Sequence, residues 1–149
     1  MTSNKFLILL LGTMNEIRTI TRIQKMAFLC DKILFKNTPH YTDWKPYFYG
    51  PYSEKLAEDI KYYESKDQRL IKGKLVEETF ANIVTRYSLT IKGRSEFSKL
   101  LIDFTEQIKI KELLQVYQSH ETNDKLLKFV YERYPEYTTN SVIKKKLFE

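Results

Sequence analysis

Hydrophobic positions at helical spacing dominate the first third of the chain. The apolar run at residues 6–11 predicts a buried first helix from residue 4 to about residue 12, with Gly12 placed to end it and residues 15–19 as a connection. From Thr21 to about residue 35, apolar residues follow Ile23 at offsets of three, four, seven, ten and eleven. This spacing predicts an amphipathic helix that Thr19 or Thr21 caps. Cations dominate its polar face, which consists of Arg18, Arg22, Lys25, Lys32 and Lys36 against Asp31.

Residues 37–52 lack a helical pattern and carry three prolines and six aromatic residues. Alternation over residues 44–49 permits a short strand, which Pro46 would keep at a sheet edge. Gly50 and Pro51 then predict a turn, after which Ser53 offers a hydroxyl cap to a third helix over residues 53–65. The inner stripe of that helix consists of Leu56, Ala57, Ile60 and Tyr63.

The second half predicts a β-hairpin followed by more helices. Residues 70–76 and 83–89 are rich in β-branched and aromatic residues, and residues 77–82 between them read as a loop or an extension of the strands. Thr90 caps a fourth helix that runs to about residue 107, with an apolar face of Phe97, Leu100, Leu101 and Phe104. Two further helices are expected at about 109–119 and 122–133, and Thr139 or Asn140 could cap a last short one.

This order of three helices, a hairpin and further helices is that of a winged helix-turn-helix domain. We therefore expect an α+β, mainly α fold: a winged-helix-like domain at residues 1–107, with the hairpin as its wing, and a C-terminal helical extension at 108–149 packed on it as one globular unit. The linker between the second and third helices is much longer than the tight turn of a helix-turn-helix.

Several segments resemble a known family. They are Arg18-Thr19-x-Thr21-Arg22-Ile23-Gln24-Lys25-Met26-x-Phe28-Leu29, Tyr47-Phe48-Tyr49-Gly50-Pro51-Tyr52-Ser53-x-x-Leu56-x-x-Asp59-Ile60, Tyr87-Ser88-Leu89-Thr90-x-x-Gly93 and Phe129-Val130-Tyr131-x-x-Tyr134-Pro135-Glu136-Tyr137-Thr138. Together they resemble the YwgA-like family of small prokaryotic and archaeal proteins. The Gln-Lys and Tyr-Gly-Pro motifs are also similar to the more distant Panacea antitoxin domain. The resemblance implies a winged-helix-like fold with a helical C-terminal part, and it implies no particular function.

The chemistry-bearing residues argue against an enzyme. His40 and His120 have no cysteine partners at metal-ligand spacing, and no phosphate loop, nucleophile elbow or metalloprotease motif is present. We expect no cofactor and no metal. Cys30 is the single cysteine and lies on an apolar helical face, which indicates a buried hydrophobe and a cytoplasmic protein. The run at residues 6–11 is too short to span a membrane.

The net charge of +6 favours an anionic partner, with duplex DNA first. A transcription regulator would contact DNA through the second helix, the wing and the start of the fourth helix. The expected contacts are Arg18, Arg22, Lys25, Lys72, Lys74, Arg86 and Arg94. The third helix does not suit base readout, because its four acids Glu54, Glu58, Asp59 and Glu64 outnumber Lys55 and Lys61.

A protein-interaction module, adaptor-like or antitoxin-like, is the alternative. In that interpretation the acidic helix at 53–65 and the aromatic loop at 37–52 contact a protein partner. The apolar faces of helices 109–119 and 122–133 either pack internally or form a homodimer. The six aromatic rings could also stack on single-stranded bases, although they more often belong to the core. The lysines at 144–146 could touch nucleic acid or anionic lipid, but a solvated terminus is the simpler interpretation.

Overall fold

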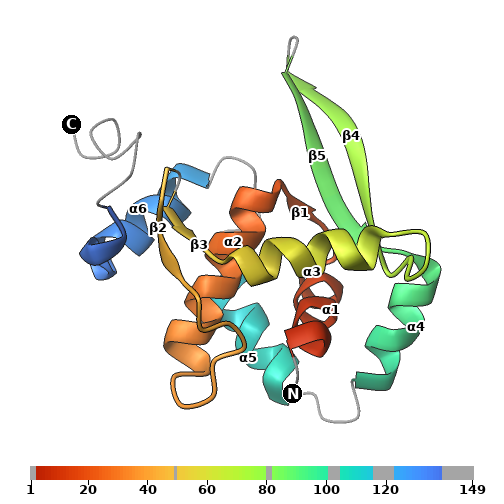
Figure 1. The fold of residues 1–149 in the computed structure, drawn as a ribbon, viewed down its shortest axis with the longest axis horizontal. Helices are drawn as coiled ribbons and strands as arrows, with labels where there is room; N and C mark the ends of the chain where they lie inside the picture. The colour runs from red at the N-terminus through yellow and green to blue at the C-terminus, as the bar shows by residue number, and fades with distance from the viewer. Residues whose placement is uncertain (1–2, 49, 80–81, 101–104, 116–122, 139–149) are drawn as a thin grey trace.

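Helix α1 (Ser3–Met14) lies at the centre of the helical body, in a computed structural model that describes residues 3–48, 50–79, 82–100, 105–115 and 123–138 (Figure 1). All six residues of the apolar run at 6–11 are buried. Helices α4 (Ile91–Leu100) and α5 (Thr105–Leu114) and strand β5 (Asn82–Leu89) pack against α1. The expected buried first helix is confirmed.

The sequence predicted that Gly12 ends α1, and this prediction is wrong. The helix continues to Met14, and Asn15 follows with a left-handed φ of 70°. A Cβ atom on Gly12 would lie 2.3 Å from the ring of Phe97. The glycine therefore serves the close approach of α4 to α1, which is a packing role rather than a capping role.

Helix α2 (Ile20–Leu29) continues into a π-helical turn (Cys30–Leu34), close to the bounds that the periodicity predicts. Thr19 is the cap, because its hydroxyl accepts a hydrogen bond of 3.3 Å from the Arg22 amide. The following loop leads to a two-stranded antiparallel sheet of β2 (Lys45–Tyr47) and β3 (Gly50–Tyr52). Gly50 and Pro51 thus begin a strand and do not form the predicted turn. Helix α3 (Glu54–Glu64) begins directly after Ser53, as expected.

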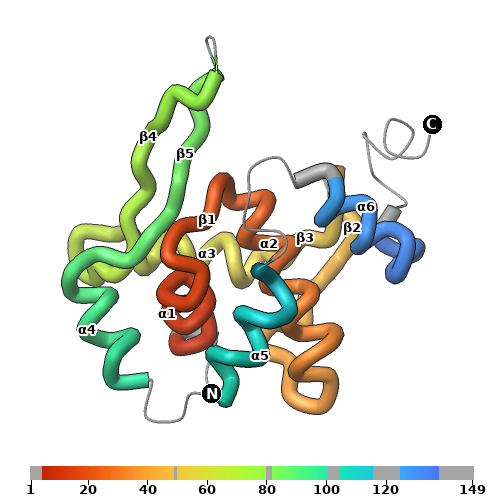
Figure 2. The backbone as a smooth tube through the Cα atoms, turned by 180° about the vertical axis from the view of Figure 1, so that it is seen from behind, coloured from red at the N-terminus to blue at the C-terminus, as the bar shows by residue number. Residues whose placement is uncertain are grey.

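A second antiparallel sheet has the strand order β1-β5-β4. Strands β4 (Ile71–Thr79) and β5 form the predicted hairpin, and residues at both ends of the 77–82 segment extend its strands. Strand β1 (Ile17–Arg18) lies where the sequence predicted only a connection, and it pairs with β5 in the register Ile17↔Tyr87 and Arg18↔Arg86. Figures 1 and 2 both show the β4–β5 hairpin projecting away from the helical body.

The two C-terminal helices pack on α1 and α2, respectively. Helix α5 already begins at Thr105, so residues 105–107 belong to it and not to the fourth helix as predicted. Helix α6 (Asn123–Arg133) packs on α2, and a 3-10 turn (Pro135–Thr138) follows. Ile110, Leu114, Leu126, Leu127, Val130 and Tyr131 are buried within the chain, so these residues are not available to a homodimer face. Leu101, Phe104, Tyr117 and the expected last helix with the lysines at 144–146 lie outside the described residues.

The described part of the chain is thus an α+β, mainly α fold with two small antiparallel sheets. Among the described helices, none has the length and apolar character needed to cross a bilayer.

Candidate nucleic-acid interface

Three cations lie side by side across the three-stranded sheet. Arg86 on β5 pairs with Arg18 on β1 and with Lys74 on β4, so the three side chains share one face of the sheet. Lys72 lies two residues before Lys74 on β4 and therefore belongs to the same face. Lys72 and Lys74 are exposed, and Arg18 and Arg86 are partly exposed. We call Lys72, Lys74, Arg86 and Arg18 the cation row.

Glu78 holds the two arginines of the row together. Its carboxylate accepts a hydrogen bond of 2.5 Å from Nε of Arg18 and one of 3.0 Å from an Nη of Arg86. Arg86 also contacts Glu16 at 3.3 Å. Burial of Glu78 opposes its ionisation, but the hydrogen bonds and charges of Arg18 and Arg86 prevail and lower the pKa of this carboxyl. The row thus contains two exposed lysines and two arginines that converge on one carboxylate.

The opposite face of the same hairpin carries most of its large apolar side chains, together with Thr85 and Glu77. At the root of the hairpin this face carries Ile71, Tyr87 and Leu89, which are buried against the body. Toward the tip it carries Leu75 and Ile83, whose exposed fractions are 72% and 63%. The hairpin therefore presents charge on one side and an exposed apolar pair on the other.

Arg22 and Lys25 do not lie on an exposed basic face, and this part of the prediction is wrong. Both are 1% exposed. Strand β3 and helix α6 pack on α2, so a face that is polar in sequence is covered by protein. Burial, together with the nearby charge of Arg18, lowers the pKa of Arg22, while Glu78 opposes that shift. A phosphate cannot reach either side chain in this structure.

Arg94 is exposed on α4, but it lies apart from the sheet face that carries the row. It lines a cavity of about 270 Å³ with Gly12, Asn15 and Phe97, next to the end of α1. Of the seven predicted DNA-binding residues, the structure thus brings four together, leaves Arg94 elsewhere on the surface and buries two.

The surface of α3 is acidic, although Asp59 does not belong to its exposed polar face as the sequence predicted. Asp59 is 5% exposed, and its carboxylate accepts hydrogen bonds from the hydroxyl of Tyr41 at 2.9 Å and the ammonium of Lys55 at 3.1 Å. The remaining exposed acids are Glu54, Glu58 and Glu64. These three acids outnumber the exposed Lys55 and Lys61 by one, so the exposed surface of α3 lacks the excess of cations that favours binding to the polyanionic major groove.

The Gln-Lys and Gly-Pro-Tyr-Ser motifs meet where α2, β3 and α3 join. Gln24 donates to the Ser53 carbonyl at 2.9 Å and accepts from the Ser53 amide at 2.8 Å. The Ser53 hydroxyl caps α3 through the Leu56 amide at 3.0 Å and also donates to Asp43. Gly50 has a φ of +111°, and a Cβ on it would lie 3.3 Å from the Cε atom of buried Lys25. These motifs therefore fix the direction of α3.

A second buried polar cluster orders the aromatic loop, and the sequence did not predict it. Asp31 accepts hydrogen bonds from the backbone amides of His40 at 2.9 Å and Tyr41 at 3.1 Å, and from the indole of Trp44 at 3.2 Å. His40 Nδ1 lies 3.0 Å from the same carboxylate. The sequence analysis placed Asp31 on the polar face of the second helix, whereas it lies in the π-helical turn after α2 and is 2% exposed. Tyr41 and Trp44 thus serve the core, whereas Tyr47 and Phe48 are exposed.

No cluster of three or more potential metal ligands occurs within the described ranges. Comparison of the chain with models of protein families, with curated proteins and with solved structures found no match. The resemblance to the YwgA-like family stays a prediction.

Proposed function

We propose that this protein binds duplex DNA as a winged-helix regulator whose wing is the β4–β5 hairpin. The observation that carries the proposal is the cation row on the outer face of the sheet. The order of helices around the hairpin, and the strand β1 that completes a three-stranded sheet, also suit a winged helix. The proposed contacts differ from those that the sequence predicted, because α2 contributes no exposed cation from Arg22 or Lys25.

The row suits phosphate oxygens better than base edges. Two arginines that converge on a single carboxylate are already arranged for an oxyanion, and a phosphate can take the place of Glu78. The acidic surface of α3 opposes insertion of that helix into the groove. We therefore propose binding through the DNA backbone, with little discrimination between sequences by the row itself.

Fluorescence anisotropy with a labelled duplex at several salt concentrations tests this proposal. The double variant Lys72→Ala/Lys74→Ala should weaken binding and reduce the log–log salt slope by about 2, because each phosphate that a lysine neutralises adds roughly 0.9 to that slope. The matched control is Lys109→Ala/Lys111→Ala, which removes two exposed lysines from α5 at the same spacing. Glu78→Gln should tighten binding, because it frees two arginines from a competing charge.

Equal losses in the wing and control variants would reduce the effect to net charge and contradict the proposal. Absence of binding by the unaltered protein at low salt would contradict it directly. Weaker binding by Glu78→Gln would show that Glu78 positions the arginines rather than competing with DNA.

The exposed pair Leu75 and Ile83 favours a second candidate function, that of a protein-interaction module. Large apolar side chains at a projecting tip are typical of a partner contact. Affinity purification from the native host, with bound nucleic acid and protein both sequenced, separates the two functions. If the protein is an interaction module, we expect a protein partner that the variant Leu75→Lys/Ile83→Lys no longer binds. The variant Lys72→Ala/Lys74→Ala should still bind it.

A further inference from the structure

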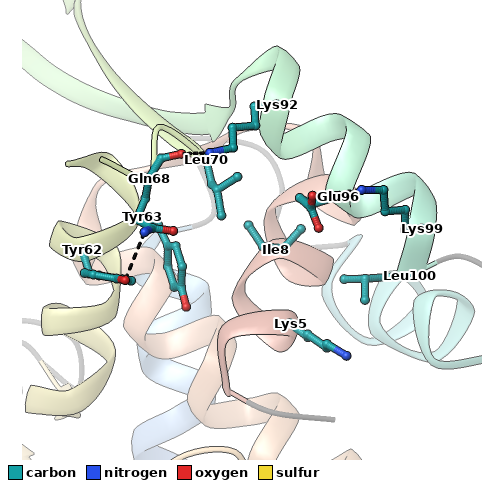
Figure 3. A pocket seen from close by; sticks show the side chains of 10 residues that line it. All are labelled: Lys5, Ile8, Tyr62, Tyr63, Gln68, Leu70, Lys92, Glu96, Lys99 and Leu100. Carbon is teal, nitrogen blue, oxygen red and sulfur yellow. Dashed lines mark hydrogen bonds and ion pairs between the residues drawn. The ribbon is translucent and has the colours of Figure 1, made fainter. Parts of the chain in front are cut away.

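A cavity of about 540 Å³ lies between α3, α4 and α1, at the root of the β4–β5 hairpin (Figure 3). Its volume is within the range of small-molecule sites in proteins. Tyr62 and Tyr63 line it from the end of α3, Ile8 from α1, and Leu100 from α4. None of the residues proposed above to contact DNA lines this cavity.

The lining combines an apolar surface with an excess of positive charge. Ile8, Leu70 and Leu100 provide aliphatic surface, and the two tyrosine rings extend it. Three ammonium groups border the cavity, from Lys5, Lys92 and Lys99, against the single carboxylate of Glu96. Glu96 lies 3.2 Å from Lys99 and offsets that lysine, whereas no ion pair joins Lys5 or Lys92 to an acid within the described residues.

The polar groups around the cavity are already held in place. Gln68 donates from its side-chain amide to the Tyr62 hydroxyl at 3.0 Å. The Lys92 ammonium donates to the Gln68 carbonyl at 3.0 Å, and an ammonium group retains two further donors after that bond. Lys92 is thereby positioned at the rim, and in the part of the chain that the structure describes it forms no ion pair with an acid.

We propose that this cavity binds a small organic anion: an apolar body about the size of two fused rings that carries one sulfonate, carboxylate or phosphate group. The ring and aliphatic walls fit the body, and the lysines of the lining, Lys92 on α4 and Lys5 on α1, favour a ligand with a negative charge. A polycation is disfavoured by the net charge of the lining, and an ion without an apolar body would leave the apolar walls unused.

The cavity lies beside both ends of the hairpin. Leu70 directly precedes β4, and its carbonyl accepts a hydrogen bond of 3.0 Å from the amide of Thr90, which directly follows β5. Lys92 lies two residues beyond Thr90 on α4. A ligand in the cavity therefore contacts the segments that anchor the hairpin, whatever the hairpin binds. Anion binding here does not depend on the proposed function.

Two fluorescent probes that differ only in charge test the inference. Anilinonaphthalene sulfonate carries a sulfonate on the apolar body of the neutral probe N-phenyl-1-naphthylamine. We expect the native protein to bind the sulfonate more tightly than the neutral probe. In the double variant Lys5→Gln/Lys92→Gln, affinity for the sulfonate should fall about tenfold, or about 1.4 kcal/mol, while affinity for the neutral probe stays unchanged.

Two further variants make the test specific to the cavity. Glu96→Gln should tighten sulfonate binding, which is opposite in sign to the lysine variant. Lys109→Gln/Lys111→Gln removes the same charge from α5 outside the cavity and should change neither affinity.

Each variant is first shown by circular dichroism and urea unfolding to be folded, because the sulfonate probe also binds partly unfolded protein. Equal affinity for the two probes would overturn the proposal. So would a loss in the α5 control as large as that in Lys5→Gln/Lys92→Gln.

Discussion

The junction of α2, β3 and α3 and the β4–β5 hairpin use polar residues in opposite ways. Gln24 at the junction and Asp31 in the cluster beside it are buried and bind backbone groups of the segment between α2 and α3. On the hairpin, the polar residues of the outer face contact one another and solvent, and only the root of the hairpin is buried. The polar groups of the junction thus fix conformation, while the hairpin leaves its charges accessible.

This difference explains why the most distinctive motifs do not mark the proposed binding surface. The Gln-Lys and Tyr-Gly-Pro segments attract attention in the sequence, yet their residues set the direction of α3. Three of the four cations of the row, Lys72, Lys74 and Arg86, lie on β4 and β5 outside the distinctive segments, and Arg18 stands at the start of one. In this chain, a distinctive motif indicates a demanding backbone geometry more than a ligand.

Asp31→Ala is the most direct way to break the buried polar cluster beside the junction. The substitution leaves the amides of His40 and Tyr41 and the indole of Trp44 without their carboxylate acceptor. Because buried donors without partners are costly, we expect a loss of about 3–4 kcal/mol in the free energy of unfolding, measured by urea denaturation. Asp67→Ala, at an exposed acid, is the control and should change stability by no more than about 0.5 kcal/mol. Similar losses in both variants would contradict the role assigned to the Asp31 cluster.

Gly50→Ala and Gly73→Ala form a matched pair across the two regions. At Gly50, φ is +111° and a Cβ would lie 2.9 Å from Leu127, so backbone strain and overlap both oppose alanine. We expect a loss of about 2–4 kcal/mol there.

Gly73 has no such φ, although a Cβ on it would lie 2.9 Å from a side-chain carbon of Thr85 and 3.1 Å from the ring of Tyr87. Because the overlap is present without the backbone strain of Gly50, a smaller cost of about 1–2 kcal/mol is expected at this position. Thermal unfolding measures the loss of stability in each variant. Equal losses would remove the contrast between a constrained junction and a tolerant hairpin.

Periodicity was enough to predict most of the fold. The helices and the hairpin show the side-chain periods of their secondary structure, and these periods are the same whichever element packs on them. Strand β1 was missed because two residues cannot display a period. Gly12 was misjudged because a glycine in the last turn of a helix resembles a terminator, whereas its packing partner Phe97 is far along the chain.

The candidate site was predicted only in part, for a related reason. A polar pattern indicates solvent only if nothing packs on the polar face, and the sequence gives no sign that β3 and α6 cover Arg22 and Lys25. Arg18, Lys72, Lys74 and Arg86 were each singled out. Their alignment depends on strand register, and so does the approach of Glu78 to Arg18 across 60 residues of sequence.

The smallest effect concerns the pH dependence of the hairpin. The pKa of Glu78 is lowered from 4.5 in the folded protein, so its ion pairs stabilise the fold fully above that value. The stabilisation is lost as the pH falls through the lower folded pKa. The free energies of unfolding of the unaltered protein and of Glu78→Gln should therefore differ by no more than about 1 kcal/mol at pH 6. This difference should become smaller at pH 3.

Glu77→Gln, at the exposed neighbouring acid, should show no such convergence. A difference at pH 6 as large as that of Asp31→Ala would mean that the hairpin ion pairs hold the fold. In that case DNA could not displace Glu78 without destabilising the protein, and the contrast between the two regions would fail. A small difference leaves the two arginines available, because exchanging Glu78 for a phosphate would then cost the fold little.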